Sequence, residues 1–228
     1  MKLLPTNLEG LFRGVKFRLS RRLPDRRPPA VWPGIESAEV VLRPFAGRFG
    51  NVKRYELLVL CAVAKHLKAE RLFEFGTFDG LTTWHLAANC GPEARLWTFD
   101  LPLDHPARSN PAHDRRVGKI HGVWLGGQFA GTPEAARITQ LHGDSLDFDP
   151  GPFDKSIDFC FIDAGHGYEH VLRDTENALQ MVKPGGVILW HDYSRWWPGV
   201  QKCLDDLADT LPVFRVAETA LGAVQLPG

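Results

Sequence analysis

The sequence predicts an α/β fold of the doubly wound, Rossmann-like kind, with a mostly parallel seven-stranded sheet and an antiparallel hairpin at its C-terminal edge. Two observations predict this class. Short apolar runs alternate with helical periodicities, and most of these runs are continuous, as in a parallel sheet covered on both faces. The last two runs have no helix between them, so we expect those strands to pair antiparallel.

Composition narrows the class of protein. The chain has 228 residues, of which 44% are hydrophobic, and this suits one large domain. The 27 basic and 27 acidic residues balance, so no overall charge favours nucleic acid as a partner. The four cysteines form no CxxC pair, and no apolar run reaches the roughly 20 residues that span a bilayer. We therefore expect a cytoplasmic protein.

Residues 1–44 are expected to precede the main domain. Apolar residues recur at helical spacing over residues 8–19 among many basic ones, and the Pro-rich residues 24–34 predict an extended linker. The basic stretch 8–22 suits weak contact with an anionic membrane surface. It equally suits packing on the domain or on a second subunit of a homodimer, and these alternatives stay open.

Residues 45–228 are expected to form the main domain. It begins with a helix within residues 51–70. Strands are expected at 71–75, 95–100, 137–144, 156–163, 187–192, 213–218 and 222–226, and further helices at 79–90, 168–182 and 199–211. Residues 101–136 are too long for an ordinary connection, so we expect a lid-like insertion, with a short helix starting after Thr132.

The loop after the first main strand indicates a cofactor. Ligands of open α/β sheets lie beyond the carboxyl ends of the strands, where Gly76 permits a tight turn and Gly80 begins a helix against the ligand. A dinucleotide fingerprint would require glycine in place of Phe78 and of Leu81, which disfavours a nicotinamide cofactor. Asp100, at the end of the next strand, can accept hydrogen bonds from ribose hydroxyls.

Three motifs carry a family resemblance: EFGTFDG at 74–80, FIDAGHGYE at 161–169 and HDY at 191–193. The chain resembles a small bacterial branch of the class I S-adenosylmethionine-dependent methyltransferases, related to metal-dependent O-methyltransferases, over roughly residues 45–226. The resemblance implies S-adenosylmethionine as cofactor. It also implies that Glu74, Gly76 and Thr77 line the methionine end, that Asp100 and Leu101 hold the ribose and adenine, and that Asp144 and Ser145 flank the adenine amino group.

Asp163 and Asp192 end neighbouring strands, so we expect their carboxylates to meet. A carboxylate such as Asp163 lowers the cost of burying a sulfonium cation, and we count it with the cofactor residues. Methyl transfer to oxygen needs a deprotonated, oriented hydroxyl, which a metal or a histidine base can provide. Asp163, His166 and His191 are the expected catalytic residues, and Asp163, His191 and Asp192 the expected metal ligands.

The metal and the acceptor stay open. A histidine ligand suits manganese, iron or zinc, whereas magnesium prefers oxygen. His170 is expected on the outer surface of its helix. The leading hypothesis is a methyltransferase acting on a hydroxyl of a small molecule or sugar. The alternatives are a metal-dependent enzyme of other chemistry on the same scaffold and a non-catalytic module that binds S-adenosylmethionine.

Overall fold

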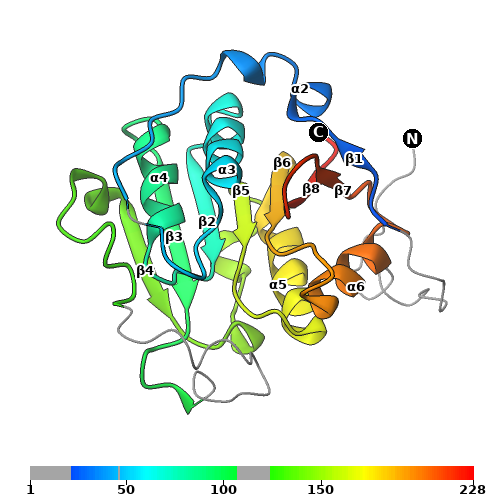
Figure 1. Ribbon diagram of the computed structural model, residues 1–228. Helices are drawn as coiled ribbons and strands as arrows, with labels where there is room; N and C mark the ends of the chain where they lie inside the picture. Colours follow the sequence, from blue (N-terminus) through cyan, green and yellow to red (C-terminus); the bar gives the residue numbers. More distant parts are fainter. Residues whose placement is uncertain (1–21, 46, 107–123) are drawn as a thin grey trace.

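The computed structural model describes residues 22–45, 47–106 and 124–228, and it confirms the α/β class. The strands form one sheet in the order β1-β7-β8-β6-β5-β2-β3-β4 (Figure 1). Strand β8 runs antiparallel to β6 and β7, and the other neighbouring pairs are parallel. The strands are β1 Asp25–Arg26, β2 Arg71–Phe75, β3 Arg95–Asp100, β4 Ile138–His142, β5 Ile157–Ile162, β6 Val182–Trp190, β7 Phe214–Val216 and β8 Gly222–Gln225.

The sheet has one strand more than the seven that the sequence predicts. The additional strand, β1, lies in the Pro-rich segment 24–34 and pairs with β7. Arg215 of β7 donates two hydrogen bonds of 2.6 Å to the Asp25 carboxylate. After helix α2 (Pro28–Val31), the Trp32 ring is buried against Phe214. The segment is therefore packed on the domain and is not an extended linker, because an edge strand and a large aromatic ring hold it there.

Four helices cover the two faces of the sheet (Figure 1): α3 Arg54–His66, α4 Leu81–Asn89, α5 Tyr168–Met181 and α6 Pro198–Leu207. Side chains alternate along a strand, so each strand serves both faces. In β5, Phe159 and Phe161 join the core with α3 and α4, whereas Cys160 and Ile162 join the core with α5 and α6. The central strands are thus buried on both sides, as the continuous apolar runs predict.

Two connections differ in detail from the sequence expectation. Helix α5 ends at Met181, and β6 begins at Val182, earlier than the strand expected at 187–192; the register of β6 against β5 shifts in this added part. Within the expected insertion 101–136, residues 107–123 lie outside the described residues. Its later part returns to the start of α4, where Gln128 N donates to Asp79 O at 2.8 Å, and a short 3-10 helix, Pro133–Arg137, follows. The basic stretch 8–22 lies outside the described residues except for its last residue.

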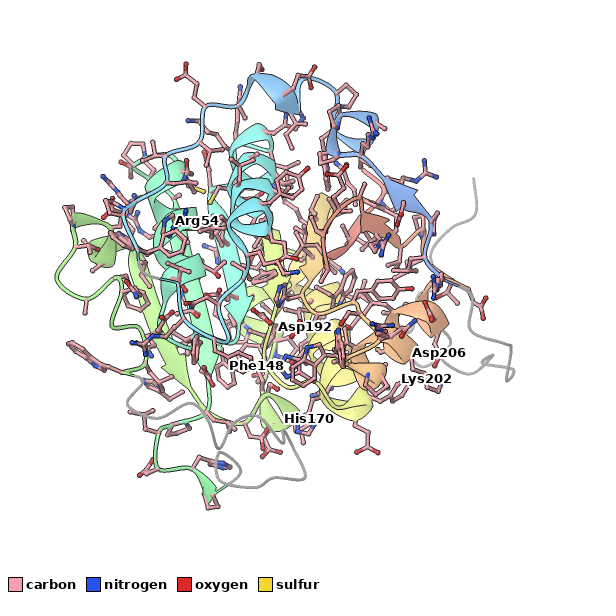
Figure 2. All side chains as sticks on the ribbon, in the orientation of Figure 1. Arg54, Phe148, His170, Asp192, Lys202 and Asp206 are labelled. Carbon is pink, nitrogen blue, oxygen red and sulfur yellow. The ribbon has the colours of Figure 1, made fainter. Side chains whose placement is uncertain are left out.

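Some polar side chains lie on the outer surface, and others lie near the middle of the molecule (Figure 2). Lys202 and Asp206 pair at 2.6 Å on an outer face of α6, and Tyr168 of α5 donates to the same carboxylate at 2.9 Å. Asp192, in contrast, lies in the turn after β6 and His191, near the middle of the molecule. In the part of the chain that the structure describes, no helix combines the length and the apolar character needed to cross a bilayer.

Candidate functional site

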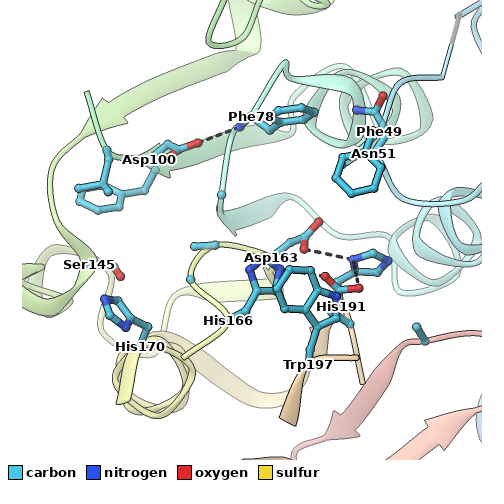
Figure 3. A pocket seen from close by; sticks show the side chains of 18 of the residues that line it. Phe49, Asn51, Phe78, Asp100, Ser145, Asp163, His166, His170, His191 and Trp197 are labelled. Atoms are coloured by element: carbon cyan, nitrogen blue, oxygen red, sulfur yellow. Dashed lines mark hydrogen bonds and ion pairs between the residues drawn. The ribbon is translucent and has the colours of Figure 1, made fainter. Parts of the chain in front are cut away.

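A cavity of about 530 Å³ lies beyond the carboxyl ends of β2, β3, β4, β5 and β6 (Figure 3). One end is lined by residues expected to bind the cofactor, namely Gly76, Asp100, Leu101, Asp144 and Ser145. The other end is lined by the expected catalytic and metal-binding residues, namely Asp163, His166, His191 and Asp192. The topology therefore brings residues from the ends of five strands to one hollow.

Gly76 lines the cavity directly after β2. Its φ of +100° lies in the left-handed region, and its amide donates to Phe99 O at 2.8 Å. A Cβ atom here would overlap the Asp163 carbonyl group and lie 2.9 Å from the Ala164 nitrogen. Only glycine lets the ends of β2 and β5 approach so closely.

We expect Gly76→Ala to weaken binding of S-adenosylhomocysteine by at least about 100-fold, or to prevent folding, because the new methyl group must displace backbone. Gly91→Ala is the matched control, since a Cβ there meets no atom within 4 Å. Calorimetric titration and thermal melting of both variants distinguish the outcomes. Equal melting temperature and affinity in the two variants would contradict the role assigned to Gly76.

Three residues expected at the cofactor lie behind the cavity wall. Glu74 is 3% exposed and accepts hydrogen bonds from Thr83 and, at 2.9 Å, from Thr98. Burial raises the pKa of Glu74 to about 8, so it is a neutral acid near pH 7 and ties β2 to its neighbours. The buried Thr77 hydroxyl pairs with that of Thr98 at 2.8 Å, and Gly80 packs against the Phe129 ring.

Backbone amides hold the two carboxylates at the cofactor end. Asp100 Oδ2 accepts from the Phe78 amide at 2.9 Å, and Phe78 itself has a φ of +46°. Asp144 Oδ1 accepts from Leu146 N at 3.0 Å and so begins a 3-10 helix, Ser145–Asp147. These bonds fix the direction of both side chains at the ends of β3 and β4 before any ligand binds.

His191 lies between carboxylates at the opposite end of the cavity (Figure 3). Its Nδ1 is 3.1 Å from Asp163 Oδ1 and 3.6 Å from Asp192 Oδ1, and its Nε2 is 3.2 Å from Glu56 Oε2. Burial alone would lower the pKa of His191, but the adjoining carboxylates, Asp163 foremost, raise it well above its ordinary value. Burial raises the pKa of Asp163, with His191 acting in the opposite direction. The histidine and its acids therefore share protons as one network.

A second histidine–carboxylate pair adjoins the first. His166 Nε2 is 2.8 Å from Asp192 Oδ2, and the His166 ring stacks on Trp197 with ring centres 3.9 Å apart and planes at 18°. Asp192 has a φ of +60°, a left-handed conformation that aspartate tolerates better than most residues. This turn lets one carboxylate face both His166 and His191.

The expected metal ligands do come together. One ligand atom each from Asp163, His191 and Asp192 lies within 4.8 Å of the others. Two carboxylates and an imidazole suit Mn²⁺, Fe²⁺ or Zn²⁺ better than Mg²⁺. The donor set fits a divalent cation, because Glu56 can accept the Nε2 proton of His191 while Nδ1 faces the carboxylates, which is the usual support of a metal-binding histidine.

Sequence reasoning missed part of the cavity wall. Glu56 gave no signal beyond its place in the first turn of a helix, and Phe49 and Asn51 lie in the segment before α3, which has no periodicity. His170, expected on the outer surface of α5, borders the cavity instead, because the first turn of α5 points toward the cofactor end. A local pattern cannot reveal which distant segment closes a pocket.

A family model described as a methyltransferase domain matches residues 73–193. The catechol O-methyltransferase of Mycobacterium tuberculosis is 30% identical over 130 residues, which are 57% of this chain and 51% of that protein. The chain thus spans about half the length of this curated relative.

Solved structures are similar in fold at low sequence identity. An O-methyltransferase of Streptomyces achromogenes involved in tomaymycin synthesis, in complex with S-adenosylmethionine, has a TM-score of 0.56 and 19% identity over 78% of this chain and 82% of that one. A TDP-rhamnose 3′-O-methyltransferase of calicheamicin biosynthesis has a TM-score of 0.53 and 18% identity over 76% and 81%. Since the family model matches more than half of the chain, the chain belongs to the methyltransferase domain family.

Proposed function

We propose that the protein is an O-methyltransferase that transfers a methyl group from S-adenosylmethionine to a hydroxyl of a small molecule. The observation that carries the proposal is the grouping of Asp163, His191 and Asp192 in the cavity that Asp100 borders at its other end. This arrangement sets proton-handling groups beside a nucleoside-sized hollow. The catechol O-methyltransferase at 30% identity supports oxygen as the methylated atom, and the sugar O-methyltransferase fold agrees with it.

The cofactor end suits a cationic, phosphate-free ligand. S-adenosylmethionine brings an activated methyl group on a sulfonium centre. Asp100, Leu101, Asp144 and Ser145 all line the cavity. Asp100 would accept hydrogen bonds from the ribose hydroxyls, Leu101 and Ser145 would contact the adenine, and Asp144 would accept from its amino group. The Asp163 carboxylate lowers the cost of burying the cation. The loop after β2 carries no G-x-G-x-x-G fingerprint for a pyrophosphate, in keeping with this ligand.

The opposite end handles the acceptor hydroxyl. Asp163, His191 and Asp192 would hold a divalent cation, which lowers the pKa of a hydroxyl and fixes its position. His166 takes up the hydroxyl proton, and the Asp192 carboxylate at 2.8 Å stabilises the imidazolium that results. Stacking on Trp197 holds the His166 ring in place.

The entrance favours an acceptor with an apolar ring face. Phe49 and Trp196 both line the cavity, yet they are 62% and 64% exposed. Large aromatic side chains left open to water at a pocket mouth are typical of a surface that a ligand covers. Catechol and a TDP-sugar are therefore suitable probe acceptors, since each presents a ring that carries hydroxyl groups.

We expect S-adenosylhomocysteine to bind the wild-type protein in isothermal titration calorimetry, and Asp100→Ala to weaken that binding by about 10- to 100-fold through loss of the ribose contacts. Asp104→Ala is the matched control, because Asp104 is exposed and does not line the cavity. Failure of the wild-type protein to bind at millimolar ligand would overturn the proposed function.

A further inference from the structure

Glu56 is a buried acid at the catalytic end that the proposed reaction leaves without a role. It is the third residue of α3 and is 1% exposed. Its Oε1 accepts from Ala220 N at 2.8 Å, and its Oε2 accepts from Lys53 N at 2.9 Å. Oε2 also lies 3.2 Å from His191 Nε2. One carboxylate therefore joins the start of α3, the end of β6 and the turn between β7 and β8.

The contact with His191 determines which ring nitrogen faces the reaction. A carboxylate can only accept, so the nitrogen beside Glu56 must carry a proton. Nδ1, on the other side of the ring, lies 3.1 Å from Asp163 and 3.6 Å from Asp192. Without a cation both ring nitrogens carry protons, because carboxylates face both of them. Glu56 keeps the proton on Nε2, so Nδ1 is the nitrogen that can give up its proton to bind a cation between Asp163 and Asp192.

We propose that Glu56 is a positioning residue, which accepts the Nε2 proton of His191 and thereby holds the ring with Nδ1 turned toward Asp163 and Asp192. The inference rests on the proposed function, because it assigns His191 a task at the methyl acceptor. It explains, in addition, why Nε2 of His191 carries a proton and why the ring points as it does.

If Glu56 only stabilised the start of α3, it would not need all of these contacts. Glu56 also accepts from the Lys53 amide at the start of α3, as the acidic residue of a capping box does, and glutamine at this position can do so equally well. Capping alone does not require the carboxylate to be buried or to reach residues 135 and 164 positions away in the sequence. Glu56→Gln therefore separates the two roles, since it preserves a cap and removes the charge beside His191.

The test compares the full-length wild-type protein, Glu56→Gln and a matched control, Glu169→Gln. Glu169 is an exposed acid in the first turn of α5 and so loses a similar helix-terminal charge. Long-range ¹H–¹⁵N spectra of histidine-labelled protein report which His191 nitrogen carries the proton, with His191→Gln used for assignment. Titration with Mn²⁺, followed by the electron paramagnetic resonance of the free ion, reports the metal affinity.

We expect His191 Nε2 to be protonated in the wild-type protein and in Glu169→Gln, and this single pattern to be lost in Glu56→Gln. We also expect Glu56→Gln to weaken Mn²⁺ binding by about 10- to 100-fold, with S-adenosylhomocysteine affinity unchanged. An unprotonated Nε2 in the wild-type protein, or the same His191 spectrum in all three proteins, overturns the proposal. If Mn²⁺ does not bind the wild-type protein, the histidine spectra alone decide whether Glu56 positions His191. Should Glu56→Gln not fold, Glu56→Asp replaces it, because the shorter carboxylate withdraws from His191 and the same loss is expected.

Lack of S-adenosylhomocysteine binding by the wild-type protein would refute the proposed function, whereas the spectra would still decide the role of Glu56. The two failures are therefore distinguishable. The cofactor titration reports on the end of the cavity that Asp100 and Ser145 line, and the histidine spectra report on the end that Glu56 supports.

Discussion

Replacing Asp163 with asparagine is expected to lower the turnover number for methyl transfer by at least about 100-fold. Asparagine keeps the size of the side chain but lacks the negative charge that faces His191 Nδ1 at 3.1 Å. Without that charge the group of Asp163, His191 and Asp192 loses one of its two carboxylates, and both cation binding and the orientation of His191 suffer. The loss should fall mainly on kcat, because the acceptor pocket keeps its shape.

The measurement is the initial rate of methyl transfer from S-adenosylmethionine, with Mn²⁺ present and with catechol and TDP-rhamnose as probe acceptors. Rates are compared on the probe that the wild-type protein methylates faster. Asp209→Asn is the control, because Asp209 is exposed and does not line the cavity. An Asp163→Asn variant with wild-type turnover would refute the catalytic assignment. A fall in S-adenosylhomocysteine affinity as large as the fall in rate would instead place Asp163 in cofactor binding alone.

Replacing Asp174 with asparagine is expected to flatten the dependence of stability on pH. Asp174 lies in α5, fully buried, and neither carboxylate oxygen meets a hydrogen-bond partner among the described residues. Burial raises the pKa of Asp174 from 3.8 to about 7, although the neighbouring Ser145 side chain acts in the opposite direction. A carboxyl group that must stay neutral in the fold is stabilising only while it is protonated.

Proton linkage gives the direction in which the stability contributed by Asp174 changes with pH. Between pH 3.8 and about 7 the folded state keeps a proton on Asp174 that the unfolded chain releases, so this residue's contribution to stability falls as pH rises. The full loss is roughly 4 kcal/mol. Asparagine cannot ionise, so the free energy of unfolding of Asp174→Asn, relative to that of the wild-type protein, should rise by roughly 3 kcal/mol from pH 4.5 to 7.5.

Urea unfolding at several pH values within that window measures the difference. The exposed Asp147 provides the matched control, and Asp147→Asn should follow the wild-type curve. Parallel curves for the wild-type protein and Asp174→Asn would show that Asp174 has no raised pKa in the folded state. Asp174 also lies close to the cofactor end of the cavity, because Asn177, one turn further along α5, donates to Ser145 O at 3.3 Å.

The sequence alone was sufficient for the fold class and for the edge of the sheet that carries the site. Continuous apolar runs predict buried parallel strands, and the residue that follows such a run must lie at the carboxyl edge. Asp100 ends a strand, and Asp163 and the pair His191-Asp192 each follow one, so their grouping in one cavity could be predicted from local pattern and topology.

Only the tertiary structure decided what these residues touch. Glu56 reaches His191 across 135 positions, and no periodicity encodes a contact of that separation. Glu74 lies within β2, next to its last residue, yet burial makes it a neutral acid behind the cavity wall, because desolvation outweighs the hydrogen bonds from its two threonines. Strand β1 likewise depends on an edge that β7 supplies. Local sequence specifies the elements and their ends, whereas burial and long-range pairing arise only when the elements pack.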